Sequence, residues 1–407
     1  MNKISLFKTF GIHKNIFESD ENNRKIDIYK FENSTVTGLN LYYPNVLLKT
    51  KNDMVLPLLE RTMSLNCGTI YEKYNMEFQY SENKTINICD FPVFFFIYNT
   101  DNYFHFLYDS IPYLISYLFL KKELPNIKLL MQFPNEQKKD FYPFVMEFLE
   151  ILNIFESDIV VVDEYTEYKE IYISTSYTHD FDSNLPPRKE IYDFYQKIVN
   201  VVKEKNVHTK TPEKIYISRR TWLHNDFSNI GTNYTTRRRL VNEDELVEKL
   251  LKEGFVEVFT EKLSTNEKIL YFANATHVVG AIGGGISNVL FSPKTTKLDA
   301  LVSPGFLDVN KRFKYSLECV DVSYIMNTKH VENTYFKTYM RVKTIDDKIV
   351  GEIEKIYDDK LLVSYTDGSN TGWNAQCKYK QIELNFDHVV KLDDGLNSPW
   401  EIVVCTR

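Results

Sequence analysis

The stretch that decides the fold runs from 277 to 303 and reads HVVGAIGGGISNVLFSPKTTKLDALVS. It starts with an apolar run at 277–282, turns at three successive glycines, and reaches a second strand-like segment, KLDALVS, at 297–303. Short continuous apolar runs are typical of strands buried on both faces, and the intervening residues 286–291 suit a short helix. The stretch therefore predicts a strand–turn–helix–strand unit of a parallel α/β sheet.

The same alternation continues toward the N-terminus. Helical patterns at 264–275 and 242–255 alternate with strand-like runs at 256–260 and 214–219. An earlier series has strand-like runs at 91–98, 127–133, 158–163 and 170–175, with helical patterns at 103–122, 136–152 and 187–205. Two such series indicate two α/β domains, each built on a parallel sheet.

A polar, lysine-rich stretch at 202–212 separates the two series, and we place a domain boundary there. The first predicted domain, 1–205, has an irregular β-rich lead-in, and the second, 212–335, is a doubly wound half. After these, short strands divided by Asp-Asp and Asp-Gly turns predict a small β domain of SH3 or Tudor type at 339–407. The sequence leaves open whether this domain only packs against the rest or binds an acceptor or partner.

Composition excludes several classes of protein. The chain has 407 residues, of which 43% are hydrophobic and 26% charged, as is typical of a soluble globular protein. Its 49 basic and 56 acidic residues give a net charge of -7, so we expect no nucleic-acid partner. The most apolar segment, 103–120, contains His105, Asp109 and Pro112, so we expect no transmembrane segment.

The cysteines and the first residues bear on the compartment. The five cysteines are scattered and show no paired metal-ligand spacing, which favours reduced cytosolic thiols. The first residues, MNKISLFKTFGIHKN, lack the apolar run of a signal peptide. We expect a cytoplasmic protein; a peripheral position at a membrane and the oligomeric state are left open.

The first candidate constellation is a polar pair in an apolar helix. His105 and Asp109 are four residues apart, so they share one face of the predicted helix. A buried carboxylate needs a partner, and His105 is the nearest one in sequence. The pair suits general base catalysis, and it also suits a satisfied polar pair in a core helix.

Two further constellations suit a phosphate ligand. Gly283, Gly284 and Gly285 let the backbone approach a ligand closely, and Ser287 and Asn288 follow in the first helical turn. The arginines Arg219, Arg220 and Arg239 flank the strand at 214–219 and the helix after it. Guanidinium groups at the carboxyl edge of a parallel sheet suit phosphate recognition, although exposed arginines are also common.

Together these residues resemble glycosyltransferase family 61, which includes plant xylosyltransferases and animal O-linked N-acetylglucosaminyltransferases. Three blocks are similar to the family's motifs, in the same order. They are NYFHFLYDSIPYL at 102–114, IYISR at 215–219 with RRRLVNEDEL at 237–246, and LYFANATHVVGAIGGGISNVLF at 270–291. The ordered set is more specific than any one block.

The resemblance implies a GT-B type of α/β fold, in which two Rossmann-like domains face a cleft. It also implies an inverting transfer from a nucleotide-sugar, UDP-sugar being our first choice, to a glycan or glycoprotein hydroxyl, with no metal and no other cofactor. Asp109 or His105 would be the base or would orient it. The donor would bind Arg219, Arg220, Arg239, Gly283, Gly284, Gly285, Ser287 and Asn288.

One position departs from the family pattern. Ile282 stands where the family usually carries the His of its H-G-A-G segment, and Gly284 replaces the Ala. A hydrogen-bonding group near the donor is therefore missing. This keeps two alternatives open, a catalytically silent carbohydrate- or nucleotide-binding protein with a C-terminal interaction module, and a nucleotide-sugar epimerase.

Overall fold

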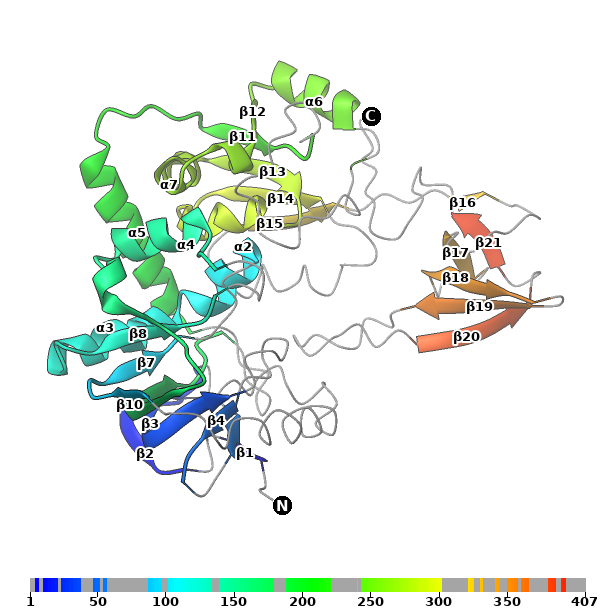
Figure 1. Ribbon diagram of the computed structural model, residues 1–407. Helices are drawn as coiled ribbons and strands as arrows, with labels where there is room; N and C mark the ends of the chain where they lie inside the picture. Colours follow the sequence, from blue (N-terminus) through cyan, green and yellow to red (C-terminus); the bar gives the residue numbers. More distant parts are fainter. Residues whose placement is uncertain are drawn as a thin grey trace. The chain divides into compact units, whose positions relative to one another are not determined.

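The computed structural model of the chain describes most of its α/β regions (Figure 1). The described residues are 4–6, 10–20, 23–37, 47–51, 54–56, 87–96, 102–133, 139–178, 188–220, 240, 243–301, 321–325, 330–331, 341–344, 350–357, 360–365, 380–385 and 389–392. The chain divides into two units, the first formed by 1–202 with 231–233 and the second by 203–230 with 234–407. Mixed α/β architecture is confirmed.

The first unit is built on one ten-stranded sheet. Its strands are β1 (Ile4–Leu6), β2 (Ile12–Phe17), β3 (Ile26–Thr37), β4 (Leu47–Lys49), β5 (Met54–Leu56), β6 (Asn87–Cys89), β7 (Val93–Phe95), β8 (Lys128–Met131), β9 (Ile159–Val161) and β10 (Thr166–Ser174). The order is β1-β5-β4-β3-β10-β7-β8-β9, with β2 beside β3 and β6 beside β10. Strands β10, β7, β8 and β9 pair in parallel, whereas β3 pairs antiparallel with β10. The predicted lead-in is thus an extension of the same sheet.

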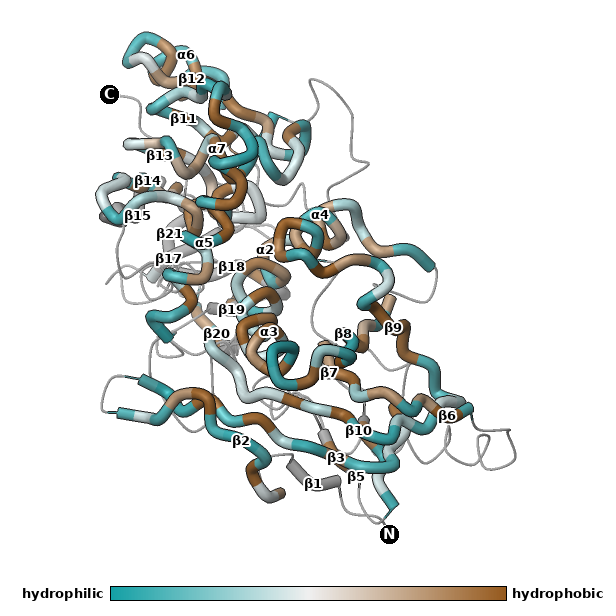
Figure 2. Tube along the Cα trace, turned by 90° about the vertical axis from the view of Figure 1, so that its left-hand side faces the viewer, coloured by the Kyte–Doolittle hydropathy of each residue, from teal (hydrophilic) through white to brown (hydrophobic). Residues whose placement is uncertain are grey.

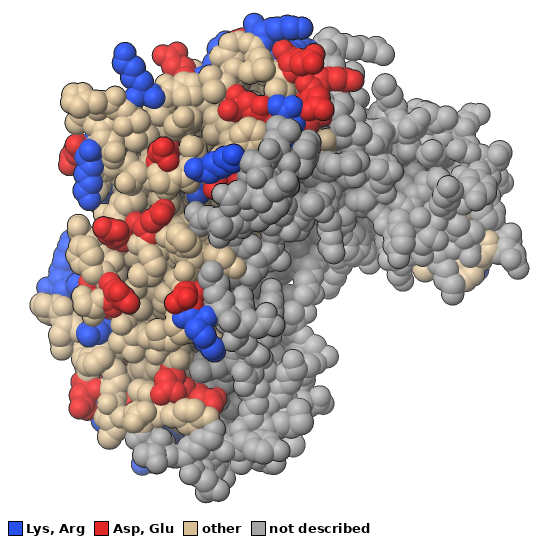
Figure 3. Space-filling model, turned by 45° about the horizontal axis from the view of Figure 1, so that its top comes forward, with Lys and Arg blue, Asp and Glu red and all other residues tan. Residues whose placement is uncertain are grey.

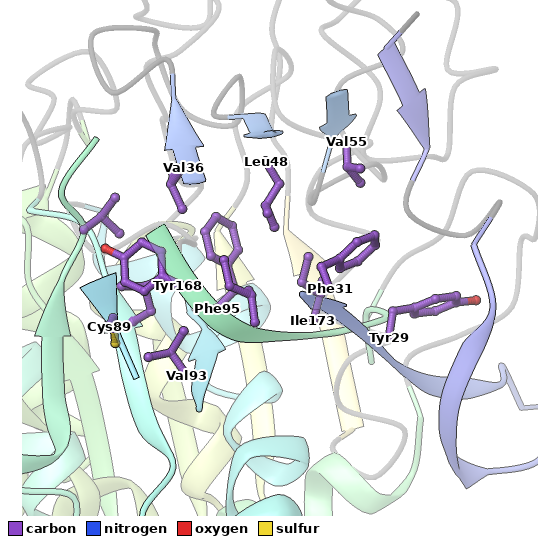
Figure 4. Packing of buried hydrophobic residues seen from close by; sticks show 13 residues of the cluster. Tyr29, Phe31, Val36, Leu48, Val55, Cys89, Val93, Phe95, Tyr168 and Ile173 are labelled. Atoms are coloured by element: carbon purple, nitrogen blue, oxygen red, sulfur yellow. The ribbon is translucent and has the colours of Figure 1, made fainter. Parts of the chain in front are cut away.

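One face of this sheet carries a core that joins the lead-in to the parallel strands (Figure 4). Phe31 of β3 and Val55 of β5 lie in the same buried cluster as Phe95 of β7 and Tyr168 of β10. Their rings and branched side chains are almost fully removed from water, which favours the folded state by roughly 1.5–3 kcal/mol for each apolar side chain. This shared core explains why the two kinds of strand form one sheet.

The described part of the first unit has five helical segments besides one short 3-10 turn. They are α2 (Tyr103–His105), the π-helical turn η2 (Phe106–Ser110), α3 (Tyr113–Glu123), α4 (Pro143–Ile151) and α5 (Glu190–Lys205), which runs across the unit boundary. A further single turn, η3, covers Glu156–Asp158. In Figure 2, α3 is brown at its leucines, isoleucine and phenylalanine and teal at its charged C-terminal end. The predicted helix at 103–122 is therefore present, but a π-helical turn interrupts it.

The second unit contains a five-stranded parallel sheet. Its strands are β11 (Lys214–Ile217), β12 (Val256–Val258), β13 (His277–Ala281), β14 (Lys297–Leu301) and β15 (Asp321–Ile325), in the order β12-β11-β13-β14-β15. All four pairings are parallel. In chain order this is 2-1-3-4-5, one of the two common doubly wound arrangements. The last strand, β15, was not predicted.

Helices α6 (Glu243–Lys252) and α7 (Thr265–Asn274), with η5 (Thr260–Lys262) and the 3-10 helix η6 (Ile286–Phe291), connect these strands. Leu246 and Leu250 of α6 pack in one cluster with Tyr216 and Val279 of the sheet. Ser264 caps α7, since its hydroxyl accepts a hydrogen bond from the Glu267 backbone amide at 3.3 Å. In return, the Glu267 carboxylate accepts a hydrogen bond from the Ser264 backbone amide. These elements hold the carboxyl ends of the strands in place.

The C-terminal residues form a separate antiparallel sheet of six strands. They are β16 (His330–Val331), β17 (Arg341–Thr344), β18 (Val350–Ile356), β19 (Lys360–Tyr365), β20 (Lys380–Asn385) and β21 (Val389–Leu392), in the order β16-β21-β17-β18-β19-β20. Ile353, Leu361 and Val363 form its small buried core. Among the described strands this order is open and closes no barrel, so the predicted SH3 or Tudor type stays a prediction.

A buried hydroxyl cluster in the first unit gives a test of the fold. The Ser116 hydroxyl of α3 lies 2.7 Å from the Ser174 hydroxyl and 2.9 Å from the Tyr177 hydroxyl. Ser116→Ala leaves the Tyr177 hydroxyl buried without this bond, so we expect a loss of about 1–3 kcal/mol in the free energy of unfolding. Urea denaturation measures this. Adding Tyr177→Phe should recover part of the loss, and strictly additive losses would contradict the direct contact.

Candidate functional site

The candidate donor side lies where the strand order of the second unit reverses. From β11 the chain crosses to β12 on one side, and β13 pairs with β11 on the other side. Open α/β sheets bind ligands outside the carboxyl ends of the strands at such a switch point. The residues that follow β11 and β13 there are Arg219 and the glycine turn, so the topology brings these two predicted constellations to one sheet edge.

The two arginines after β11 have different partners. The Arg220 guanidinium makes a two-pronged ion pair with Glu257 of β12, at 2.9 Å from Nε to Oε1 and 2.5 Å from Nη2 to Oε2. Its Nη1 lies 2.7 Å from Asp244 of α6. These carboxylates raise the pKa of Arg220 further above its usual range. Arg220 therefore ties β11 to β12 and α6, whereas the backbone amide of Arg219 donates to Glu243 Oε1 at 2.6 Å.

The glycine turn packs tightly on β11. A Cβ atom at Gly285 would lie 2.8 Å from Ile217 Cγ2 and 2.8 Å from Thr260 Oγ1, and one at Gly280 would lie 2.9 Å from Ile217 Cβ. Atoms this close cannot be accommodated unless the neighbouring side chains or the backbone shift. The glycines at 280 and 285 thus let the turn approach the end of the neighbouring strand.

The side chains that follow the turn face inward. Ser287 and Asn288 are fully buried. The Ser287 hydroxyl donates to the Gly284 carbonyl, and the Asn288 amide donates to the Gly285 carbonyl at 2.8 Å. They hold the shape of the turn through these bonds. Ile282 is also buried, and its amide donates to the Leu301 carbonyl of β14 at 3.1 Å.

The predicted polar pair lies in the first unit, in the helical segment that follows β7. Asn102 caps this segment, since its side chain accepts from the His105 amide at 3.3 Å. His105 ends α2, and Asp109 lies in the π-helical turn, where the Ile111 amide donates to the Phe106 carbonyl. His105 Nδ1 is 2.8 Å from Asp109 Oδ2. The Asp109 side chain is fully buried, whereas 21% of the His105 side chain is exposed.

Sequence reasoning missed the residue that supports this turn. Tyr195 of α5 is completely buried, and its hydroxyl donates to the Leu107 carbonyl in the middle of η2. Burial, followed by the charge of Asp109, raises the pKa of Tyr195 well above its usual value. It therefore stays a neutral donor. A tyrosine in an amphipathic helix resembles any other core residue, so no sequence signal distinguishes Tyr195.

This geometry suits a general base. When Asp109 is ionised, it accepts a hydrogen bond from the N–H group at His105 Nδ1. The other ring nitrogen, Nε2, then carries the free lone pair and is the basic atom. The buried carboxylate also stabilises the imidazolium that forms when Nε2 takes a proton. His105 is the partly exposed member of the pair, and the fully buried Asp109 is its hydrogen-bond partner.

Other features bear on the site without belonging to it. Arg239 lies outside the described residues. A groove of about 490 Å³ on the first unit is lined by residues of β2, α3 and α5, including Phe17, Phe119 and Lys197, and by none of the candidate residues. Across 102–133, 139–178, 243–301 and the other described segments, no group of three His, Cys, Asp or Glu side chains is arranged to hold a metal.

The surface carries charges of both signs, as the 49 basic and 56 acidic residues of the sequence predict. On the face shown in Figure 3, described acidic and basic side chains are interspersed and gather in no single large patch. No helix in the described part of the chain has the length and apolarity needed to cross a membrane.

The second unit thus has an open parallel sheet whose switch point lies between Arg219 and the glycine turn, the place where open α/β sheets commonly bind ligands. Comparison with family models then gives a specific result: residues 103–298 match glycosyltransferase family 61. The match begins at Tyr103, the first residue of α2, and ends within β14, so it includes all three candidate constellations. It supports family 61 for this chain. A comparison with curated proteins gives no match.

The close packing of the glycine turn is testable. Gly285→Ala forces a Cβ against Ile217 and Thr260, so we expect a loss of about 1–3 kcal/mol in the free energy of unfolding. Gly11→Ala is the control, because a Cβ there meets nothing within 4 Å, and we expect a change within about 0.5 kcal/mol. Both values come from thermal and urea unfolding. Equal stability of Gly285→Ala and the parent protein would rule out this packing.

Proposed function

We propose that the chain is an inverting glycosyltransferase that moves a sugar from a nucleotide-sugar, UDP-sugar being the first candidate, to a hydroxyl of a glycan or glycoprotein. The observation that carries the proposal is the family 61 match over 103–298, because one match includes the His105–Asp109 pair, Arg219 and the glycine turn. A GT-B arrangement follows from the proposal, with the donor on the second unit and the acceptor on the first.

The proposed reaction uses the groups described above. The acceptor oxygen attacks the anomeric carbon as the bond from that carbon to the diphosphate breaks, and His105 Nε2 takes the proton of the acceptor hydroxyl. The electron pair of the broken bond stays on the departing nucleoside diphosphate, whose charge Arg219 stabilises. Arg239 and the turn at 283–285 assist, and Ser287 and Asn288 keep that turn in shape. The reaction as proposed needs no metal.

A transfer assay with UDP-sugars and a panel of glycan acceptors tests the catalytic pair. We expect His105→Ala and Asp109→Asn each to lower kcat by about 10²–10⁴-fold, because the acceptor loses its base or the base loses its orientation. The matched control is His277→Ala, which breaks a similar pair with Asp299 at 2.6 Å and should keep activity. Full transfer by both His105→Ala and Asp109→Asn would show that the pair is not catalytic.

The donor side has its own test. Thermal shift should show stabilisation by UDP, and Arg219→Ala should weaken UDP binding about tenfold or more, since it removes a charged hydrogen bond. Lys252→Ala, an exposed cation of α6, should bind UDP normally. Normal binding by Arg219→Ala would move the diphosphate away from this residue.

One observation favours a second function, a catalytically silent nucleotide- or carbohydrate-binding protein. Ile282 is apolar and buried where family members usually have histidine, so a polar contact to the donor is absent from this position. Binding of UDP without transfer to any acceptor, and without conversion of the sugar itself, would favour this function. If transfer does occur, the anomeric configuration of the product decides between inversion and retention.

A further inference from the structure

One carboxylate of the second unit is buried where the neighbouring acids are exposed. Helix α6 begins with three acidic residues, and Asp244 and Glu245 are exposed, as is usual for acids in a first helical turn. Glu243 is only 2% exposed. A buried carboxylate is costly unless it is well bonded, so its contacts show what it does.

A single oxygen of Glu243 accepts three hydrogen bonds from the end of β11. Oε1 accepts from the Tyr216 hydroxyl at 2.8 Å, from the Ser218 hydroxyl at 3.2 Å and from the Arg219 backbone amide at 2.6 Å. The shortest bond is the one to Arg219, at the point where the chain leaves the sheet. Glu243 therefore fixes the backbone of the residue proposed to meet the diphosphate.

Burying a carboxylate has a high desolvation cost for a group that only binds the end of a strand. Oε2 of Glu243 is buried and has no hydrogen-bond partner among the described residues. Burial raises the pKa of Glu243, although the bonds from Arg219, Tyr216 and Ser218 act in the opposite direction. A neutral acceptor would hold the strand end at a lower desolvation cost.

Two acidic residues of α6 bind different arginines at the end of β11. Asp244 binds the side chain of Arg220, which Glu257 also holds, whereas Glu243 binds the backbone of Arg219. The Arg220 side chain is thereby bound to β12 and α6, and the Arg219 backbone is held at the end of β11.

We propose that Glu243 is a positioning residue, which holds the Arg219 amide so that the Arg219 guanidinium meets the diphosphate of the donor. This inference rests on the proposed function. Glu243 touches no substrate in this role, and its whole effect on nucleotide binding passes through Arg219.

The test is a double-mutant cycle on UDP affinity, measured by calorimetry on the full chain. We expect Glu243→Ala to weaken UDP binding about 5- to 50-fold, and to have almost no further effect in an Arg219→Ala background, because residues that act through one another are not additive. Glu243→Gln keeps an acceptor oxygen and should bind UDP within about threefold of the parent protein. Glu248→Gln, an exposed acid of the same helix, is the matched control.

The outcomes separate the inference from the function. Normal UDP affinity of Glu243→Ala, or equal losses with and without Arg219, would overturn the positioning role even if the melting temperature falls. Should Glu243→Ala fail to fold, Glu243→Asp replaces it in the same cycle, since the shorter side chain draws the carboxylate away from the Arg219 amide. Absence of UDP binding by the parent protein overturns the proposed function and this inference with it.

Discussion

The candidate donor side depends on the parallel pairing of β11 with β13. This pairing sets Ile217 opposite Gly280, so both strands end at the same edge and the turn at 283–285 lies beside the residues after β11. Close approach requires the small residues at 280 and 285, and the helices can then place their own polar groups at that edge. A shift of one residue in register would change the position of Arg219 relative to the turn and move the buried side chains of the shifted strand to the opposite face of the sheet.

Much of the fold was predictable because buried parallel strands have a strong local signal. The runs that form β7, β8, β11 and β13 are short, largely apolar and bounded by polar turns, whereas β12 and β14 contain Glu257 and Asp299. Two features were not predictable for a physical reason. The π-helical turn of η2 differs from an α-helix by one hydrogen-bond step, which leaves little trace in apolar periodicity, and the antiparallel pairing of β3 with β10 joins segments far apart in sequence.

The site was predictable only in part. His105 and Asp109 stand out because polar residues interrupt an apolar helix, and the glycines stand out because three are consecutive. Glu243 does not stand out, because an acid at the start of a helix is the ordinary case. Its burial depends on the three groups at the end of β11 that donate hydrogen bonds to its carboxylate. Arg220 likewise has its partners only when β12 and α6 have assembled around it. Such roles are properties of the tertiary structure.

The pairing of β3 with β10 also affects how the chain is made. Ile28 pairs with Ser174, so the first unit cannot complete its sheet until well over a hundred further residues have left the ribosome. Until then β3 has an open edge with unpaired backbone groups, which is a risk for aggregation during synthesis. The sheet of β11 to β14 uses only neighbouring segments of the chain and can assemble soon after each emerges. During synthesis the sheet of the first unit thus stays incomplete over a longer stretch of chain than the sheet of β11 to β14.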